Sequence, residues 1–323
     1  MRLSFLRPLS ISLFSLVLGC EGALSGSGVE VGSGQNLTCS AAPYPIILHH
    51  GFSGGDGATA ANYFEGVAED LRWNVGEIVY ESSVDPFNSS EVRGGQLAAI
   101  VDDVLAETGA CKVNIIAHSQ GGLDSRYLIS SLGYGDRVAA LITVATPHRG
   151  TALADLALGF AGGWTEDIAN SIAGWTKGKS LQDPNLRAAF ETLAEKNSGD
   201  FNYYNPNDPK VAYYSIAGRS LLATAGSACA NGLWGNSSYV DIADATYAAS
   251  GSYLLGSLLP WRWKANDGVV TVESARWGTF LGCYPADHSD LTGSYSGSTD
   301  QSWGFDHYQL YRDLAGLLLR NGF

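Results

Sequence analysis

Ser119 stands in a pentapeptide whose residue sizes suit a nucleophile on a tight turn. Ala117 and Gly121, two residues before and after it, are both small, as a sharp strand-to-helix turn requires because its backbone crowds those positions. A serine on such a turn is presented at the carboxyl edge of a sheet, where it can attack a carbonyl carbon. Ser53, in Gly51-Phe-Ser-Gly-Gly55, has the same spacing, but glycine-rich sequence follows it instead of a helical pattern. The context therefore favours Ser119.

A serine hydroxyl becomes a useful nucleophile when a histidine accepts its proton and a carboxylate orients that histidine. The chain has six histidines, and the two late ones, His288 and His307, are the candidates for this base. His288 lies in a polar stretch, as a base near solvent should, whereas His307 adjoins an apolar segment typical of a packed or surface histidine. Asp267 is the candidate carboxylate. Its Asn-Asp-Gly context is a turn signal, and a turn at a strand end is also where an orienting carboxylate belongs.

The elements that must position these residues alternate along the chain from residue 44. Nearly all-apolar stretches predict strands, and apolar residues at helical spacing between them predict helices. Such alternation predicts an α/β fold with a mainly parallel sheet covered on both faces, in which ligands bind at the carboxyl ends of the strands. We expect one domain over residues 41–323, with an insertion at about 152–208 where the alternation lapses. The expected strands are 44–49, 75–80, 112–118, 138–144 and 211–216, and the expected helices are 61–71, 97–105, 123–132 and 310–319.

Composition restricts the classes of protein to which the chain can belong. It has 323 residues, of which 45% are hydrophobic and 16% charged, enough apolar sequence to exclude wholesale disorder. The formal net charge is −13, and so acidic a surface repels phosphate backbones, which excludes nucleic acid as a partner. No apolar run reaches the roughly 18 residues that a membrane-spanning helix needs.

Residues 1–19 predict a signal peptide, because a basic start precedes the short apolar stretch Ile11–Leu18. Val17-Leu-Gly-Cys20 resembles the lipobox of bacterial lipoproteins, in which the cysteine becomes the diacylated first residue. Ordinary cleavage a few residues later is the alternative. Residues 20–40 are rich in glycine and serine and predict a flexible tether. We therefore expect an exported protein, either anchored to the cell envelope through Cys20 or secreted.

Export implies an oxidising compartment, in which the four remaining cysteines are expected to pair. Four cysteines allow three pairings. Cys39 and Cys111 each precede an expected strand, so the two residues share one edge of the sheet if those strands are parallel neighbours. This placement favours the pairs Cys39–Cys111 and Cys229–Cys283.

Several motifs occur in a fixed order, densely over residues 44–155 and again towards the C-terminus. They are Tyr44-Pro-Ile-Ile-Leu-His-His-Gly51, Arg93-Gly-Gly-Gln-Leu97, Lys112-Val-Asn-Ile-Ile-Ala-His-Ser-Gln-Gly-Gly-Leu-Asp-Ser-Arg-Tyr127, Ala145-Thr-Pro-His-Arg-Gly150, Asn266-Asp-Gly-Val-Val270 and Asp287-His-Ser-Asp290. Together they resemble the true lipases of Pseudomonas and Burkholderia type, which are secreted triacylglycerol hydrolases with the α/β-hydrolase fold. Ala117 replaces the family's usual glycine, but it is also small. The resemblance implies a catalytic triad of Ser119, Asp267 and His288.

The tetrahedral intermediate of such a reaction needs two preorganised N–H donors for its oxyanion. In this fold one donor is the amide of the residue after the nucleophile, here Gln120. The other comes from the loop after the first strand, and the resemblance points to the amide of Phe52, with Gly51 allowing close approach of the backbone.

The family also carries a structural calcium near the catalytic histidine, held by two aspartates and by carbonyl oxygens. Asp290 matches one of these aspartates, and Asp241 is the expected second, with Asp244 as the alternative. The family's glutamine downstream of the histidine is absent here, although a backbone or water oxygen can replace it. The alternative is that both aspartates only cap or solvate loops.

The resemblance implies no organic cofactor. Many relatives need a dedicated folding chaperone, and we expect a monomer.

Apolar side chains lie on short helical segments broken by glycine within 152–208. They predict a lid over an acyl-chain pocket, with ordinary core helices as the alternative. The expected function is that of an extracytoplasmic serine ester hydrolase, a triacylglycerol lipase acting at a lipid–water interface. A polyester depolymerase or an acyltransferase on the same fold is the alternative. A non-catalytic surface lipoprotein is a remote one, because all three triad positions are filled.

Overall fold

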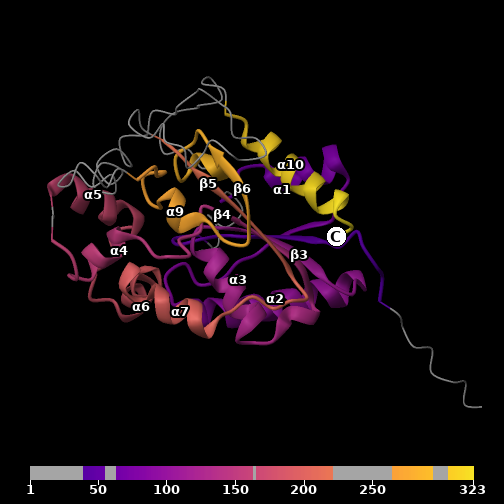
Figure 1. The fold of residues 1–323 in the computed structure, drawn as a ribbon, viewed down its shortest axis with the longest axis horizontal. Helices are drawn as coiled ribbons and strands as arrows, with labels where there is room; N and C mark the ends of the chain where they lie inside the picture. Colours follow the sequence, from indigo (N-terminus) through magenta and orange to yellow (C-terminus); the bar gives the residue numbers. More distant parts are fainter. Residues whose placement is uncertain (1–38, 55–62, 163–164, 221–263, 294–304) are drawn as a thin grey trace, which may run out of the picture. The chain divides into compact units, whose positions relative to one another are not determined.

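A parallel sheet of six strands is formed within the part of the chain that the computed structural model describes, residues 39–54, 63–162, 165–220, 264–293 and 305–323 (Figure 1). The strand order is β2-β1-β3-β4-β5-β6, and every neighbouring pair is parallel. The carboxyl ends of all six strands therefore lie along one edge. The strands are β1 Ile46–His49, β2 Val79–Glu81, β3 Val113–His118, β4 Val138–Val144, β5 Ala212–Gly218 and β6 Thr279–Tyr284.

Helices cover both faces of the sheet, as Figure 1 shows. Alternate strand residues point to opposite faces, so Ile46 and Leu48 pack in the core cluster under one pair of helices, and Ile47 packs in the cluster under another pair. The predicted α/β fold with a parallel sheet between two helical layers is confirmed. The first pair is α1 (Val67–Asp70) and α10 (His307–Arg320), and the second is α2 (Ser90–Thr108) and α3 (Gln120–Ser130).

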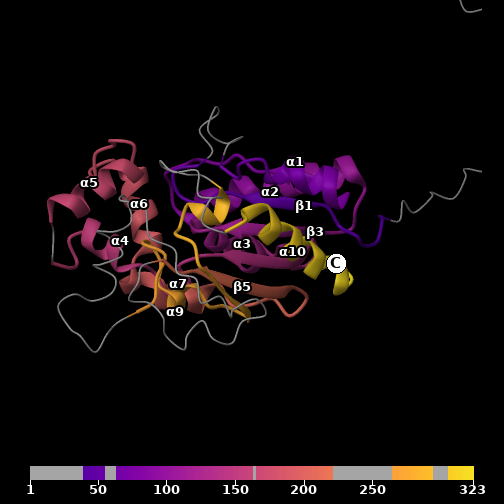
Figure 2. The ribbon, with the colours of Figure 1, turned by 90° about the horizontal axis from the view of Figure 1, so that it is seen from above.

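A third apolar cluster lies at one end of the sheet, where α4, α5 and α6 gather (Figures 1 and 2). These helices lie within the predicted insertion. Phe87 and Leu123 join the cluster from the main body of the fold. The remaining elements, with these helices, are η2 Leu71–Val75, η3 Tyr134–Asp136, α4 Ala152–Ala157, α5 Glu166–Trp175, α6 Pro184–Leu193, α7 Glu195–Tyr204, α9 Val272–Ala275 and η7 Asp290–Thr292.

The strands that the sequence predicts match the structure to within a few residues, and β4 has the expected bounds. The helix expected at 61–71 is different, since a four-residue α1 continues into the π-helix η2 and residues 55–62 lie outside the described part. Strand β6 was not expected. It is an edge strand with two partly or fully exposed residues at its start and a glycine inside it, so it lacks the continuous apolar run that marks the central strands.

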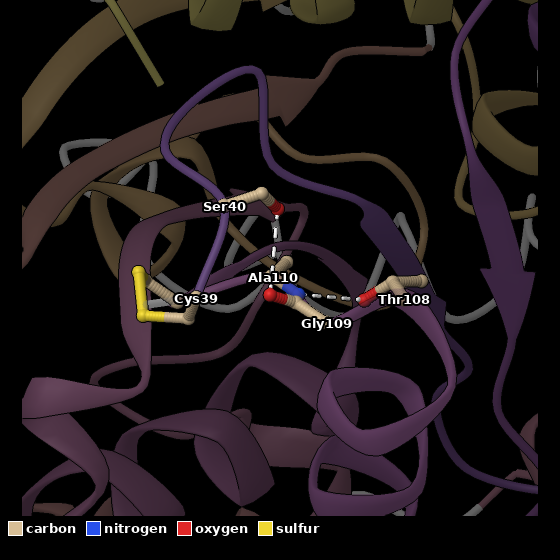
Figure 3. Close-up of a disulfide and its surroundings, with 6 residues drawn as sticks. Cys39, Ser40, Thr108, Gly109 and Ala110 are labelled. Carbon is tan, nitrogen blue, oxygen red and sulfur yellow. Dashed lines mark hydrogen bonds between the residues drawn. A yellow bond between two sulfur atoms is a disulfide. The ribbon is translucent and has the colours of Figure 1, made fainter. Parts of the chain in front are cut away.

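Cys39 and Cys111 form a disulfide at the edge of the sheet where β1 and β3 begin (Figure 3). The bond is flanked by a parallel bridge between Ser40 and Ala110, so the predicted pairing and its place are both found. Cys283 is also disulfide-bonded, whereas Cys229 lies outside the described residues, and the second predicted pair stays a prediction.

The predicted signal peptide, the lipidation site Cys20 and most of the tether lie outside the described residues. Within the described residues, none of the helices is both long enough and apolar enough to cross a membrane.

Candidate active site

Ser119 occupies the turn between β3 and α3, with the left-handed backbone angles φ 54° and ψ −130°. Such angles are strained for any residue with a side chain, and they hold the hydroxyl at the carboxyl edge of the sheet. The turn forces close backbone packing. A Cβ at Gly121 would lie 2.7 Å from the carbonyl oxygen of His50, and one at Gly51 would lie 2.6 Å from Cβ of Ser119. The structure thus explains why glycine is needed at positions 51 and 121.

His288 joins Ser119 to Asp267 across 169 residues of sequence. Nε2 of its ring lies 2.9 Å from Oγ of Ser119, and Nδ1 lies 2.8 Å from Oδ2 of Asp267. A carboxylate only accepts hydrogen bonds, so Nδ1 carries the proton and Nε2 is left to accept the proton of the serine. The three residues that the sequence singles out are brought together in the order needed for proton transfer.

The carboxylate of Asp267 is buried and held by its own loop. Its Oδ1 accepts the amides of Val269 at 2.9 Å and Val270 at 2.7 Å, which leaves Oδ2 for His288. The backbone amide of His288 also donates to the carbonyl of Asp267 at 2.9 Å. Asp267 therefore both stabilises the turn and orients His288, and the two interpretations that the sequence offered hold together.

The rival candidates lie elsewhere. His307 begins α10, and its ring binds the backbone carbonyl of Glu65 at 3.0 Å. Ser53 reaches the cavity wall, but its amide donates to the carbonyl of Pro86, and the next described helix, α1, begins only at Val67.

Two neighbours of the triad were not expected from the sequence. The ring of His118 lies 4.5 Å from that of His288, centroid to centroid, and its Nδ1 is 2.8 Å from the hydroxyl of Tyr63. Burial, together with the nearby His288, keeps the pKa of His118 well below its usual value. This imidazole is therefore neutral and adds no positive charge beside the base.

The amides of Phe52 and Gln120 lie on the two segments that flank Ser119. Gln120 is the first residue of α3, so its N–H is one of the free donors at a helix N-terminus. Phe52 follows Gly51, whose backbone packs against the serine. Neither amide has a hydrogen-bond partner among the described residues. Their role as the oxyanion donors stays a prediction.

A cavity of about 370 Å³ opens beside Ser119 and His288. That volume falls within the range of small-molecule sites. Part of its wall carries polar groups, including Tyr63 and Thr292. The rest is mainly apolar and comes from the oxyanion loop, the insertion and the loop after Asp267, through Phe52, Leu153, Phe190, Leu193, Val269 and Val270.

The expected calcium ligands are only partly within the described chain. Asp290 is buried in η7, where its Oδ2 accepts the amide of Asp287 at 3.2 Å, while Asp241 and Asp244 lie outside the described residues. Where the chain is described, no three His, Cys, Asp or Glu side chains gather as a metal site. Asp290 alone does not make one, so the ligand set stays a prediction.

Comparisons with known proteins agree with this geometry. The family model described as the alpha/beta hydrolase fold matches residues 44–246. The chain belongs to the α/β-hydrolase family. A triacylglycerol lipase of Vibrio cholerae is 31% identical over 97% of this chain and 98% of that protein. A triacylglycerol lipase of Burkholderia plantarii is 45% identical over a shorter segment, 36% of this chain and 33% of that protein. The predicted membership among the bacterial lipases is confirmed, and the protein is a carboxylic ester hydrolase.

Solved structures show the same fold at lower identity. A Bacillus licheniformis lipase in its mature form superposes with a TM-score of 0.60 at 23% identity, covering 85% of this chain and 94% of that one. A Staphylococcus hyicus lipase gives a TM-score of 0.60 at 21% identity, with 86% and 95% covered. These likenesses support the α/β-hydrolase architecture.

Proposed function

We propose that this hydrolase is an extracytoplasmic triacylglycerol lipase, which cleaves the carboxylic esters of fatty acids through an acyl-enzyme. The observation that carries the proposal is the 2.9 Å contact between Oγ of Ser119 and Nε2 of His288 at a largely apolar cavity. A nucleophile and its base within hydrogen-bond distance suit acyl transfer, and an apolar wall suits an acyl chain.

In the first half-reaction, Oγ of Ser119 forms a bond to the ester carbonyl carbon while His288 accepts the hydroxyl proton. The carbonyl oxygen becomes an oxyanion that accepts the N–H groups of Phe52 and Gln120. Asp267 stabilises the imidazolium through Nδ1–H. When the carbon–oxygen bond to the alcohol breaks, His288 returns the proton to the departing alkoxide, and the acyl group remains on the serine.

Water completes the cycle by the same steps. His288 takes a proton from the water as its oxygen attacks the acyl carbon, and the second tetrahedral intermediate uses the same two amides. Collapse breaks the ester bond to Ser119, whose Oγ regains the proton from His288. A carboxylic acid leaves, and the enzyme returns to its starting state.

Part of the insertion at 152–208 is proposed to act as the lid. Its first helix, α4, is fixed at its start to the body of the fold, because Oγ1 of Thr151 donates to the carbonyl of Val269 at 2.6 Å. The carboxylate of Asp155 accepts the amide of Glu195 at 2.9 Å, which ties α4 to α7 within the insertion. Helix α5 lies between Gly159 and Gly178, both with positive φ, and packs Ile168 and Ile172 into the apolar cluster. This helix is the segment that we expect to open on a lipid surface.

Activity measured against substrate concentration tests the lid. A rise in rate where a triglyceride begins to aggregate supports an opening helix, and smooth saturation through that threshold argues for an always-open site.

The site itself is tested with a series of p-nitrophenyl esters on the wild type and on Ser119→Ala. We expect the wild type to release p-nitrophenol, and the variant to lose at least about 10³-fold in kcat, because the attacking oxygen is gone. Activity that survives in a folded Ser119→Ala protein would remove the nucleophile assignment. Added alcohols distinguish the alternatives, since an acyltransferase gives mainly the transferred ester and a lipase gives the free acid.

Export and anchoring are also proposed, from residues 1–20 of the sequence. Expression of the full chain in a bacterial host, with radiolabelled palmitate, tests both. We expect label in the wild type and none in Cys20→Ala. An unlabelled wild type that is found in the medium would identify the protein as secreted.

A further inference from the structure

The peptide bond between Gly51 and Phe52 carries the predicted oxyanion donor on one side and a carbonyl on the other. In a trans peptide the N–H and C=O groups point in opposite directions, so whatever holds the carbonyl of Gly51 also aims the N–H of Phe52. That carbonyl accepts hydrogen bonds from two side chains, from Nδ1 of His50 at 2.9 Å and from the guanidinium of Arg93 at 3.2 Å, and a longer one from the amide of Gly54 at 3.4 Å. We propose that Arg93 and His50 are positioning residues that fix the oxyanion loop for catalysis.

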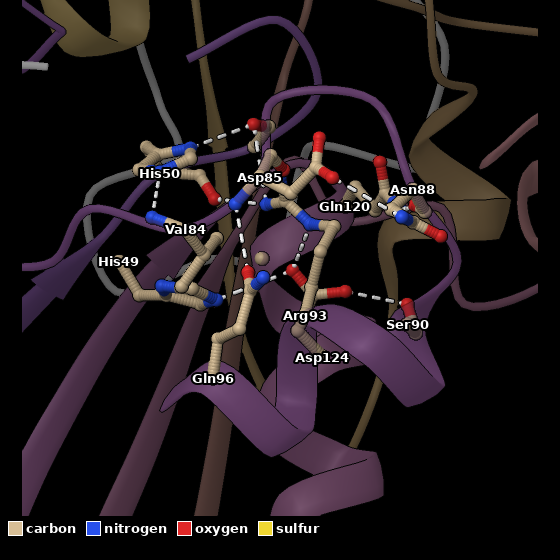
Figure 4. Close-up of polar contacts among 12 residues, drawn as sticks. His49, His50, Val84, Asp85, Asn88, Ser90, Arg93, Gln96, Gln120 and Asp124 are labelled. Atoms are coloured by element: carbon tan, nitrogen blue, oxygen red, sulfur yellow. Dashed lines mark hydrogen bonds and ion pairs between the residues drawn. The ribbon is translucent and has the colours of Figure 1, made fainter. Parts of the chain in front are cut away.

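Arg93 reaches this loop from the first turn of α2 and is completely buried (Figure 4). Its NH2 group donates to the carbonyl of His50 at 2.8 Å as well as to that of Gly51, and NH1 donates to the carbonyl of Asp85 at 2.6 Å. The planar fork of a guanidinium can bind several acceptors at fixed angles, which an ammonium group cannot. One side chain therefore ties two consecutive peptides of the oxyanion loop to the loop that precedes α2.

The charge of Arg93 is balanced inside the fold. Its Nε donates to Oδ2 of Asp124 at 2.7 Å, and both side chains are fully buried. The carboxylate of Asp124 also accepts hydrogen bonds from Oγ of Ser90 at 2.5 Å and from Nε2 of His49 at 3.2 Å. A buried ion pair is costly unless its remaining groups are hydrogen-bonded, and here they are. Because Asp124 is a residue of α3, the same pair links the oxyanion loop to the helix that begins at the second oxyanion donor.

His50 has one possible proton arrangement. The amide of Val84 donates to its Nε2 at 3.1 Å, so Nε2 is the acceptor and Nδ1 carries the proton that is given to the carbonyl of Gly51. Burial and the charge of Arg93 hold the pKa of His50 well below its usual value, which keeps this neutral form.

Two consequences follow for the oxyanion. The amide of Phe52 is oriented before substrate arrives, so no energy is spent on turning it during the reaction. Hydrogen bonds to a carbonyl also polarise its peptide, which strengthens the N–H on the other side. Both effects act on the tetrahedral state more than on bound ester. The loss should therefore fall on kcat, with little change in KM.

The inference rests on the proposed function and is tested with four variants on p-nitrophenyl butyrate. Arg93→Lys keeps the charge facing Asp124 but loses the fork, and His50→Leu removes the second donor while leaving the Arg93–Asp124 pair intact. His50→Asn supplies an amide donor near the place of Nδ1 and is the rescue variant. Gln96→Ala is the matched control, because Gln96 lies on the same helix and accepts the amide of Asp85 at 2.8 Å without touching the oxyanion loop.

The expected result is a fall in kcat of at least about 10-fold in Arg93→Lys and His50→Leu, against the roughly 10²- to 10³-fold that loss of a whole oxyanion donor costs. KM should stay within about 3-fold, Gln96→Ala should match the wild type, and His50→Asn should recover part of the loss. The Ki of a boronic acid that forms a tetrahedral adduct with the serine should rise in proportion to the fall in kcat/KM.

Three outcomes would overturn the inference. They are an unchanged kcat in both folded variants, a Ki that stays at the wild-type value while kcat falls, and an equal loss in Gln96→Ala. If Arg93→Lys does not fold by circular dichroism, the two His50 variants decide the matter. A wild type that hydrolyses no ester, or that keeps its activity without Ser119, refutes the proposed function instead, and the inference falls with it.

Discussion

Replacing Asp267 by asparagine should nearly abolish hydrolysis without disturbing the loop. The Oδ1 atom of Asp267 accepts two backbone amides, from Val269 and Val270. An asparagine must keep its carbonyl oxygen there, because a flipped side chain would turn its NH2 group against two N–H donors. Each donor left unsatisfied costs about 1–3 kcal/mol, so the flipped form is scarce.

The NH2 group of the asparagine then faces Nδ1 of His288, which must become a hydrogen-bond acceptor. The imidazole proton moves to Nε2, and the ring can no longer take the proton of Ser119. An exchange of this kind in a serine–histidine–aspartate triad costs roughly 10⁴-fold in kcat, which is about 5.4 kcal/mol at 1.36 kcal/mol per tenfold. The assay is kcat with p-nitrophenyl butyrate at pH 7.5.

Asp306→Asn is the control, since Asp306 only caps α10, by accepting the amide of Gln309 at 3.1 Å. It should keep wild-type activity. A folded Asp267→Asn protein that loses less than about 10-fold would show that the carboxylate does not set the tautomer of His288, and the reasoning would be wrong.

Three further predictions concern stability. Burial keeps the pKa values of His50, His118 and His148 well below the ordinary 6.5 in the folded protein, so below about pH 6.5 only the unfolded chain binds those protons. Stability should therefore fall as the pH drops from 7.5 to 5.5, by up to about 1.4 kcal/mol per histidine per pH unit, and equal urea midpoints at both values would contradict this. The Cys39–Cys111 bond closes a loop with a sequence separation of 72, so replacing both cysteines by serine should cost about 4 kcal/mol of unfolding free energy; a loss below about 1 kcal/mol would show that the loop is held by other contacts. If the predicted calcium is bound, excess EGTA should lower Tm and added calcium should restore it, whereas an unchanged Tm would count against the site.

The triad could be predicted because each member carries a local signal. Ser119 follows an apolar strand and has small neighbours, Asp267 lies in a turn sequence, and His288 lies in a polar loop late in the chain. Parallel strands bring their carboxyl ends together, so local signals at strand ends translate into proximity. Parallel strands also bring their amino ends together, which is why the sequence could predict that Cys39 lies beside Cys111.

The buried hydrogen-bond network of Arg93, Asp124 and His50 behind the oxyanion loop has no such local signal in the sequence. Arg93 and Asp124 lie on two helices, α2 and α3, and charged residues on helices ordinarily face solvent. Their burial depends on how α2 and α3 pack beside each other, which is a property of the tertiary structure. The role of His50 cannot be predicted from the sequence either, because it depends on which backbone amide donates to Nε2 in the folded protein. Sequence reasoning finds groups that perform chemistry more readily than groups that hold a peptide bond still.

The two sides of the cavity are held by different forces, and this difference suits the proposed reaction. On the side where charge develops, the oxyanion loop and the carboxylate of Asp267 are fixed by hydrogen bonds between buried groups. On the side of the insertion, α5 meets the cluster through apolar side chains such as Ile168 and Ile172. Contacts of that kind are non-directional, and a lipid surface can replace them at little cost in free energy. If α5 is the lid that we propose, we expect it to leave and return while the geometry around Ser119 stays the same.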